Sequence, residues 1–435
     1  MAELRSHRES TSFFEGAPSL PEVAVDPVKT VNSAATAPSP SQSMSKPHRC
    51  SFADLQTIAS QIAKGSHGGD KHVADSFVYA FDIDGVLVRG GKPIPEAIEA
   101  MRVLDGDNEY NIVVPHIFLT NGGGKTEEER CRDLSRQLGR EIKTGQFICG
   151  HTPMREMAER YKTVLVVGGE GEKCRHVAEG YGFKDVVTPG DIIKHNEAVA
   201  PFRKLTAEEY ANSRRRSFSR DVIDAIFVFA DSRDWASDIQ IMVDLAMSQG
   251  GRIGTLSTTF DEGPPIYFSH NDVVWSAAHE QVRLGMGALR RMFEVIFSDL
   301  TGGKGKARIH AFGKPQVSTF EFASRLMSDW RTTEHGLVGS LKTVYFVGDT
   351  PESDIRGTNA VNEASDDDWY SILVKTGVYQ EGNTPTYEPR VTVDTVLDAV
   401  KHGIKREMER NESGGRRKAL GLSGPSLEDS SAIDS

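Results

Sequence analysis

The amino-acid sequence predicts an α/β protein with a mostly parallel β-sheet and a second α/β domain inserted into the first. Short apolar runs typical of strands alternate with stretches of helical periodicity. Several of these runs end in acidic or glycine-rich turns, and one connection is far too long for a single crossover. In open α/β sheets such turns lie at the carboxyl edge of the sheet, where ligands bind.

The predicted strands are separated by stretches with helical spacing of apolar residues, as expected for βαβ units. The strands are predicted at Phe77–Phe81, Ile112–Leu119, Val164–Val167, Ala225–Phe229, Thr343–Val347 and Ser371–Val374.

The bulk composition limits the classes of partner. The chain has 435 residues, 38% of them hydrophobic, which is enough for more than one domain. Its formal net charge of -11 argues against nucleic acid or an anionic membrane as the main partner. No run approaches the roughly 18 apolar residues that cross a bilayer, so no integral membrane segment is expected. The four cysteines lie far apart, which favours reduced thiols in an intracellular protein.

Both ends of the chain differ from the centre. Residues 1–50 are rich in Ser, Pro, Ala and Thr without apolar periodicity, which predicts a disordered leader, and residues 406–435 predict a disordered tail. The leader lacks the apolar core of a secretory signal, and its acidic residues argue against a mitochondrial presequence. Helical spacing from Phe52 to Ile62 predicts a helix before the first strand.

The first turn that carries chemistry places Asp82 and Asp84 at i and i+2 after an apolar strand. Alternation at the strand end would direct both side chains to one side. Two close carboxylates repel, so burying them is unfavourable without a shared cation. A bound Mg²⁺ with oxygen ligands would compensate for the repulsion. Taken alone, the segment is also compatible with an ordinary Asp-Gly turn.

The second turn is TNGGG at 120–124, again after an apolar strand. A hydroxyl, an amide and bare glycine backbone suit phosphate oxygens at a strand-to-helix transition. The following Lys125 does not complete a P-loop, because GxxxxGK[ST] would require glycine at position 119. A plain glycine turn is the alternative for this segment.

The third turn contains Asp349 and Asp354 after another apolar strand. Asp349 is placed to reach a metal, and Asp354 would complete the ligand shell or hold Asp349. One basic group is also expected, to neutralise the carboxylates and a phosphate together. Lys314, in the segment GKP, is the candidate, although such a segment alone is usually a turn.

The ordered set DxDGVL, TNGGG, GKP and VGDxxxxD resembles the four motifs of phosphatases of the haloacid dehalogenase (HAD) superfamily. More closely, the chain resembles subclass IIA and, within it, the cat eye syndrome critical region family of HAD-like hydrolases. The resemblance covers roughly residues 75–400. The closer similarity lies in FDIDGVLVRGGKPIP (81–95), CGHTPM (149–154), VLVVGG (164–169), DSRDW (231–235), NDVVW (271–275) and LGMGALR (284–290).

This resemblance implies a Rossmann-like HAD core and a Mg²⁺-dependent phosphatase mechanism. Asp82 would attack phosphorus to give an aspartyl-phosphate, and Asp84 would act as general acid and base. The metal site would comprise Asp82, Asp84 through its backbone carbonyl, and Asp349, with Asp354 in support. The implied phosphate-binding residues are Thr120, Asn121, Gly122 and Lys314.

The 193-residue separation of Asn121 and Lys314 leaves room for a domain, which in subclass IIA is an α/β cap. The predicted organisation is core residues 51–151, a cap at 152–270 and core residues 271–405. Caps exclude water and select the leaving group. We expect specificity in the loop of Asp231, Arg233, Asp234 and Trp235, with Asn271 and Asp272 second. Trp235 could equally serve packing.

The predicted function is hydrolysis of a small phosphomonoester. The alternative is a HAD-fold binding or regulatory protein with weak or no turnover, or a phosphotransferase, linked to mitochondrial glycerophospholipid metabolism. The family resemblance implies a mitochondrial location and a homodimer through the cap, and a cytoplasmic location is the alternative. The physiological substrate does not follow from the sequence.

Overall fold

A computed structural model describes residues 71–365 and 367–419. The predicted leader and the helix predicted at 52–62 lie outside this range. Within the described residues, six parallel strands form the core sheet. Their order is β17 (Val391–Val393), β16 (Asp368–Val374), β15 (Thr343–Gly348), β2 (Phe77–Phe81), β6 (His116–Leu119) and β7 (Phe147–Ile148).

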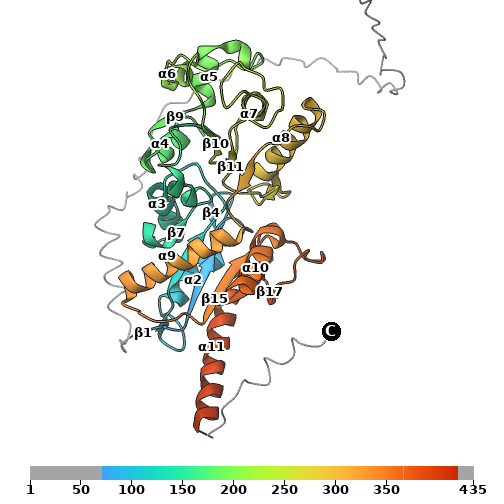
Figure 1. The fold of residues 1–435 in the computed structure, drawn as a ribbon. Helices are drawn as coiled ribbons and strands as arrows, with labels where there is room; N and C mark the ends of the chain where they lie inside the picture. The colour runs from blue at the N-terminus through green and yellow to red at the C-terminus, as the bar shows by residue number, and fades with distance from the viewer. Residues whose placement is uncertain (1–70, 366, 420–435) are drawn as a thin grey trace, which may run out of the picture. The chain divides into compact units, whose positions relative to one another are not determined.

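Helices cover both faces of the core sheet, and its strands are accordingly mostly apolar on both faces. Successive side chains of a strand point to opposite faces. In β2, Tyr79 and Phe81 accordingly pack against one layer of helices, and Val78 and Ala80 against the other. The first layer contains α2 (Pro95–Leu104), α3 (Glu127–Leu138) and α11 (Val396–Ala419), and the second contains α9 (Val317–His335) and α10 (Arg356–Ala364) (Figure 1).

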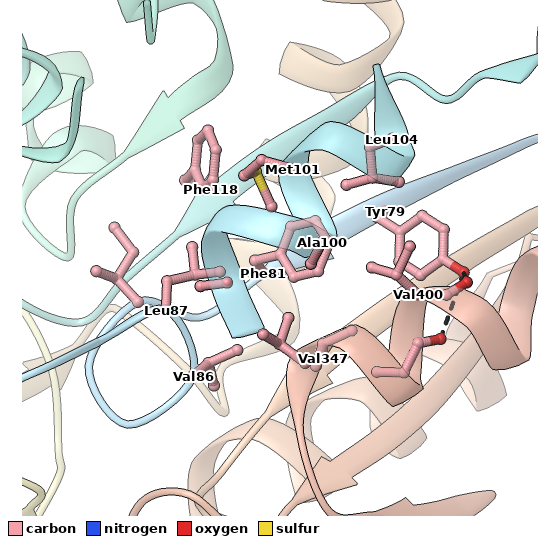
Figure 2. Close-up of a cluster of buried hydrophobic side chains, with 14 of the residues drawn as sticks. Tyr79, Phe81, Val86, Leu87, Ala100, Met101, Leu104, Phe118, Val347 and Val400 are labelled. Atoms are coloured by element: carbon pink, nitrogen blue, oxygen red, sulfur yellow. Dashed lines mark hydrogen bonds between the residues drawn. The ribbon is translucent and has the colours of Figure 1, made fainter. Parts of the chain in front are cut away.

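The first helical layer anchors the central strand through an apolar cluster with one polar connection. Tyr79 stacks on Phe81 with ring centroids 5.5 Å apart, and its hydroxyl donates to the Val400 carbonyl of α11 at 2.8 Å (Figure 2). Met101 and Leu104 of α2 lie in the same cluster. The strand that ends at Asp82 is therefore held by packing and by a buried hydrogen bond.

A second parallel sheet, the inserted sheet, lies between β7 and α9 in the sequence. Within the described residues it has five strands, with order β14 (Ile309–Ala311), β11 (Ile266–Phe268), β10 (Ala225–Val228), β8 (Thr163–Val167) and β9 (Asp185–Val187). Both of its faces are apolar. Its helices are α4 (Lys173–Gly180), α5 (Pro189–His195), α6 (Ala207–Asn212), α7 (Trp235–Ala246) and α8 (Met286–Leu300) (Figure 1).

Three short two-stranded pairs complete the strands of the described residues. In the sequence, β3–β4 follows Asp84, and β12–β13 follows the inserted strand β11. A side chain on Gly90, between β3 and β4, would contact Ala278, between β12 and β13, so these two hairpins touch. The pairs are β3 (Val88–Arg89) with β4 (Lys92–Pro93), β12 (Val274–Trp275) with β13 (Arg283–Leu284), and β1 (His72–Val73) with β5 (Ile112–Val113).

The α/β class with parallel sheets is confirmed, and each predicted strand overlaps an observed strand. The run predicted as one strand at Ile112–Leu119 divides into β5 and β6, which belong to different sheets. Two predicted boundaries need correction. The inserted sheet includes β14, so the second unit continues beyond residue 270 to about 311. The predicted tail is also wrong from 406 to 419, where α11 continues. Tyr345 donates to the buried Glu407 at 2.7 Å, which makes this polar stretch part of the core.

Candidate active site

Three neighbouring strands of the core sheet bring the polar turns together. β15, β2 and β6 lie side by side and run parallel. Asp349, Asp82 and Thr120 directly follow these strands, and all three are buried. Parallel strands end at one edge of a sheet, so residues more than 200 positions apart in the sequence form one site.

Lys314 is the central cation of this site. Its Nζ donates to Asp82 Oδ1 at 2.6 Å and lies 2.8 Å from Asp354 Oδ1. Burial by itself would lower the pKa of Lys314, but the two carboxylates outweigh it and raise the pKa. For Asp82, burial raises the pKa well above its ordinary value, and Lys314 opposes this only in part. The site thus holds more carboxylate charge than one lysine neutralises.

Asp354 has a supporting position in this structure. Its Oδ2 accepts hydrogen bonds from the backbone N–H groups of Asp349 and Thr350 at 2.9 and 3.0 Å, and its Oδ1 faces Lys314. A side chain on Gly348 would lie 2.3 Å from Asp354 Cβ, so the carboxylate fits only beside a glycine. Asp354 therefore orients the Asp349 turn and Lys314 at once.

Asp349 is held by the backbone. Its Oδ2 accepts from the Val378 N–H at 2.7 Å, and its Oδ1 accepts from the Thr350 hydroxyl at 3.1 Å. Gly85 and Gly377 adjoin the Asp349 carboxylate. A Cβ atom at these positions would lie only 2.2 and 1.8 Å from Asp349 Oδ2, so the carboxylate has room only beside glycine. Burial raises the pKa of Asp349 to about 7, with Asp354 adding to the effect.

The donor set fits a divalent cation. Among the described residues, Asp82, Asp349 and Asp354 each offer a carboxylate oxygen, and these oxygens lie within 4.8 Å of one another. Hard oxygen ligands in this number are those that Mg²⁺ prefers. A divalent charge would also offset the burial and the mutual repulsion that raise the pKa values of Asp82 and Asp349.

Asp84 stands beside this cluster, half-buried at the cavity wall. Burial raises the pKa of Asp84, while Arg130 and Lys314 oppose the shift. A carboxyl group that tends to keep its proton is suited to donate it to a leaving oxygen.

The TNGGG loop serves several purposes. Gly122 N–H donates to Thr120 Oγ1 at 3.0 Å, which leaves the hydroxyl hydrogen available to a ligand. A side chain on Gly122 would lie among Thr120 Oγ1, Arg130 Nη2 and Asp84 Oδ2. The next two glycines instead permit contact with the inserted sheet: a side chain on Gly123 would lie 2.4 Å from the carbonyl oxygen of Phe229.

The side chain of Asn121 is occupied by protein partners. Its Oδ1 accepts from the Lys314 N–H at 2.8 Å, and its Nδ2 donates to the Lys314 carbonyl at 3.1 Å and to Asp272 Oδ2 at 2.9 Å. The amide therefore positions the lysine loop, and the prediction that it contacts phosphate is not supported by this geometry.

A cavity of about 380 Å³ opens onto these groups. The predicted residues Gly122, Arg233 and Trp235 line it, together with the acids, Thr120 and Lys314. Asn271 does not line this cavity, and its Oδ1 accepts from Arg290 Nη1 at 2.7 Å, so its prediction as a substrate contact needs correction. The side chain turns towards α8 and away from the site.

Sequence reasoning missed several cavity residues. His270 is buried, with Nε2 3.8 Å from Asp231 Oδ2 and Nδ1 3.7 Å from Asp272 Oδ2. Burial would lower the pKa of His270, but the two carboxylates outweigh it and raise the pKa. Arg130 lies one turn into α3, where helical geometry directs side chains back towards the preceding loop. Trp275, Arg283 and Leu284 come from the β12–β13 hairpin.

The doubly covered parallel sheet, its acidic carboxyl edge and the lysine supplied from beyond a second α/β unit define a hydrolase of the HAD class. Comparison with known proteins agrees. The family model described as haloacid dehalogenase-like hydrolase matches residues 79–184, and a HAD-hydrolase-like model matches residues 311–399. A mitochondrial hydrolase of Saccharomyces cerevisiae is 37% identical over 355 residues, covering 75% of this chain and 95% of that protein. The chain belongs to the haloacid dehalogenase-like hydrolases, which confirms the resemblance at superfamily level.

A second relative is longer than this chain. It is a fusion of cardiolipin synthase (CMP-forming) with a mitochondrial hydrolase from Schizosaccharomyces pombe, 36% identical over 332 residues. The match covers 76% of this chain and 53% of the fusion protein, so the chain spans about half the length of that relative.

Two solved structures share the fold. A hypothetical protein from Pyrococcus horikoshii has a TM-score of 0.50 at 18% identity, covering 75% of this chain and 99% of its own. A possible sugar phosphatase of the HAD superfamily from Cytophaga hutchinsonii has a TM-score of 0.52 at 16% identity, covering 74% of this chain and 95% of its own. At such low identity these likenesses concern the fold alone.

Proposed function

We propose that this protein is a Mg²⁺-dependent phosphatase that hydrolyses a phosphomonoester through an aspartyl-phosphate on Asp82. The observation that carries the proposal is the buried arrangement of Asp82 between Lys314, at 2.6 Å, and the acids that follow β15. A binding protein has no need of so costly a cluster of buried carboxylates.

In this mechanism Lys314 holds one oxygen of Asp82, and the other attacks phosphorus. A bond forms between that oxygen and phosphorus as the bond from phosphorus to the ester oxygen breaks. Asp84 gives its proton to the departing oxygen. It then takes a proton from the water that attacks the aspartyl-phosphate, which releases phosphate and restores Asp82.

The remaining groups bind and orient. Mg²⁺ would be held by the Asp82 and Asp349 carboxylates and the Asp84 backbone carbonyl, and when bound it offsets negative charge on the phosphoryl group. Asp354 would support the site from behind, because its Oδ2 accepts hydrogen bonds from the backbone N–H groups of Asp349 and Thr350 and its Oδ1 lies 2.8 Å from Lys314 Nζ. The Thr120 hydroxyl and Lys314 would bind phosphoryl oxygens.

The names of the relatives suggest where the activity belongs. Both are described as mitochondrial hydrolases, and one is joined to a cardiolipin synthase. We propose a mitochondrial location and a phosphorylated metabolite as substrate, with intermediates of glycerophospholipid synthesis as the first to test. In the described part of the chain, no helix combines the length and apolar character needed to cross a membrane.

The test is phosphate release from a panel of phosphomonoesters, with and without Mg²⁺. The wild type is compared with Asp82→Asn and with Asp299→Asn, a control on the exposed end of α8. We expect metal-dependent turnover that Asp82→Asn lowers by more than about 10³-fold and the control leaves intact. Turnover that survives Asp82→Asn would contradict the mechanism, and its absence on every ester would contradict the activity.

A further inference from the structure

Arg130 is a cation that the phosphatase mechanism does not use. It lies in α3, directly after the TNGGG loop, and is half-buried. Its Nε is enclosed and has no hydrogen-bond partner among the described residues. An enclosed polar atom without a partner is costly, so the protein does not satisfy this guanidinium group fully. Arg130 also lines the cavity that contains Asp82, so a ligand bound there can pair with its charge.

The guanidinium group points to the leaving-group side of the site. Arg130 Nη2 would lie 3.3 Å from a side chain on Gly122, and Asp84 Oδ2 would lie 3.6 Å from the same point. Arg130 is therefore beside the acid that would protonate the leaving oxygen. A group bound to Arg130 would lie within a few bonds of the ester oxygen.

Asp84 and Arg130 also separate two cavities. Both line the 380 Å³ cavity that contains Asp82, and both line a second cavity of about 600 Å³ that does not. The second cavity has two other cations, Lys125 and Arg136, and both pair with Asp133. Arg130 forms no such ion pair within residues 71–365 and 367–419. Its charge lowers the pKa of Asp84 but has no carboxylate bound to it there, so it is available to a ligand.

We propose that Arg130 binds a second anionic group on the leaving alcohol, so that the preferred substrate is a phosphomonoester that also carries a carboxylate or a phosphodiester. The proposal rests on the phosphatase function above and narrows its substrate class. Arg130 would form charge-assisted hydrogen bonds with the second anion, while Lys314 binds the phosphoryl group. A neutral leaving group would give the half-buried guanidinium group no anion to bind.

Matched pairs of esters test this selectivity. Phosphoglycolate is compared with 2-hydroxyethyl phosphate for the carboxylate, and glycerophosphoglycerol phosphate with glycerol 3-phosphate for the phosphodiester. We expect the wild type to prefer the anionic member of at least one pair. Arg130→Gln should reduce that ratio of kcat/KM values about tenfold to a hundredfold, the effect of losing hydrogen bonds to a charged group. Arg130→Lys should retain part of the preference, and Arg132→Gln, at an exposed position of the same helix, should retain all of it.

Equal losses on both members of each pair would overturn the proposal, because Arg130 would then bind the phosphoryl group itself or serve the fold. A wild type without preference would overturn it as well. Turnover of 4-nitrophenyl phosphate tests the phosphatase function independently. If no ester is turned over, calorimetric affinities of Asp82→Asn for phosphoglycolate and 2-hydroxyethyl phosphate, with and without Arg130→Gln, decide the selectivity in the same way.

Discussion

His116 gives the core sheet a predictable sensitivity to acid. The residue is buried in β6, with its ring edge-on to Phe81 and Phe118. Its Nδ1 lies 3.0 Å from the Val114 carbonyl oxygen, and its Nε2 has no partner among the described residues. Burial lowers the pKa of His116 from 6.5 to about 3, and Arg140 adds to the effect. A proton added to this ring would bring an unpaired charge into the core.

The shift sets both the sign and the size of the effect. Between pH 6.5 and about 3 the unfolded chain binds a proton at His116 that the folded chain does not. Stability from this residue is therefore complete above pH 6.5 and is lost as the pH falls. The expected loss is about 1.4 kcal/mol at pH 5.5 and about 2 kcal/mol at pH 5, relative to a chain without the histidine.

Urea unfolding at pH 7.5 and pH 5 measures this loss. His116→Asn cannot take up the proton but retains a donor for Val114, so the wild type should lose about 2 kcal/mol more than the variant between the two pH values. Other titrating groups are shared and cancel in the comparison. His176→Asn, at an exposed position, should behave as the wild type does. Parallel losses in the wild type and His116→Asn would refute the reasoning.

Three further predictions concern the site and the thiols. In Gly85→Ala the new Cβ would lie 2.2 Å from Asp349 Oδ2, so phosphatase activity should fall more than about a hundredfold. The control Gly139→Ala, also at positive φ but facing open space, should cost only about 1 kcal/mol of stability and leave the activity intact. Equal activities of the two variants would contradict the steric argument. Lys314→Met should reduce the free energy of unfolding by about 3 kcal/mol in EDTA and by less in saturating Mg²⁺, because bound Mg²⁺ replaces the lysine charge. Calorimetry that gives the same loss of unfolding free energy with and without Mg²⁺ would contradict this. The three buried thiols have pKa values raised by burial, so a thiol reagent at pH 8 should label none of them before denaturation. Rapid labelling of the native protein would show that the core around the labelled thiol opens. They are Cys131, Cys149 and Cys174.

The core half of the site could be predicted from the sequence because it depends on local order. An apolar strand followed by a polar turn identifies a carboxyl edge, and parallel strands place their edges together. Asp82, Thr120 and Asp349 were found in this way, and the structure places them at the ends of three adjacent strands. Lys314 follows β14 of the inserted sheet, so only the need for a basic group and the motif resemblance identified it.

The residues of the cavity wall were harder to predict, because contacts between segments far apart in the sequence determine which side chains face the cavity. The segment NDVVW at 271–275 was correctly singled out, but Asn271 turns towards Arg290 while its neighbours His270 and Asp272 face the site. In an irregular segment, a shift of one residue decides which side chain faces the cavity. A strand has a two-residue alternation from which this can be predicted, but a loop has no such periodicity.

Asn121 shows why residue type alone does not assign a contact. An amide beside a phosphate-binding loop suits phosphate oxygens, yet all three of its hydrogen bonds go to partners 151 and 193 positions away. Those partners are Asp272, at the end of the inserted unit, and the backbone of Lys314. The same amide therefore joins the TNGGG loop, the lysine loop and the inserted unit. Because the lysine position depends on this connection, the inserted unit helps to build the site that contains Asp82.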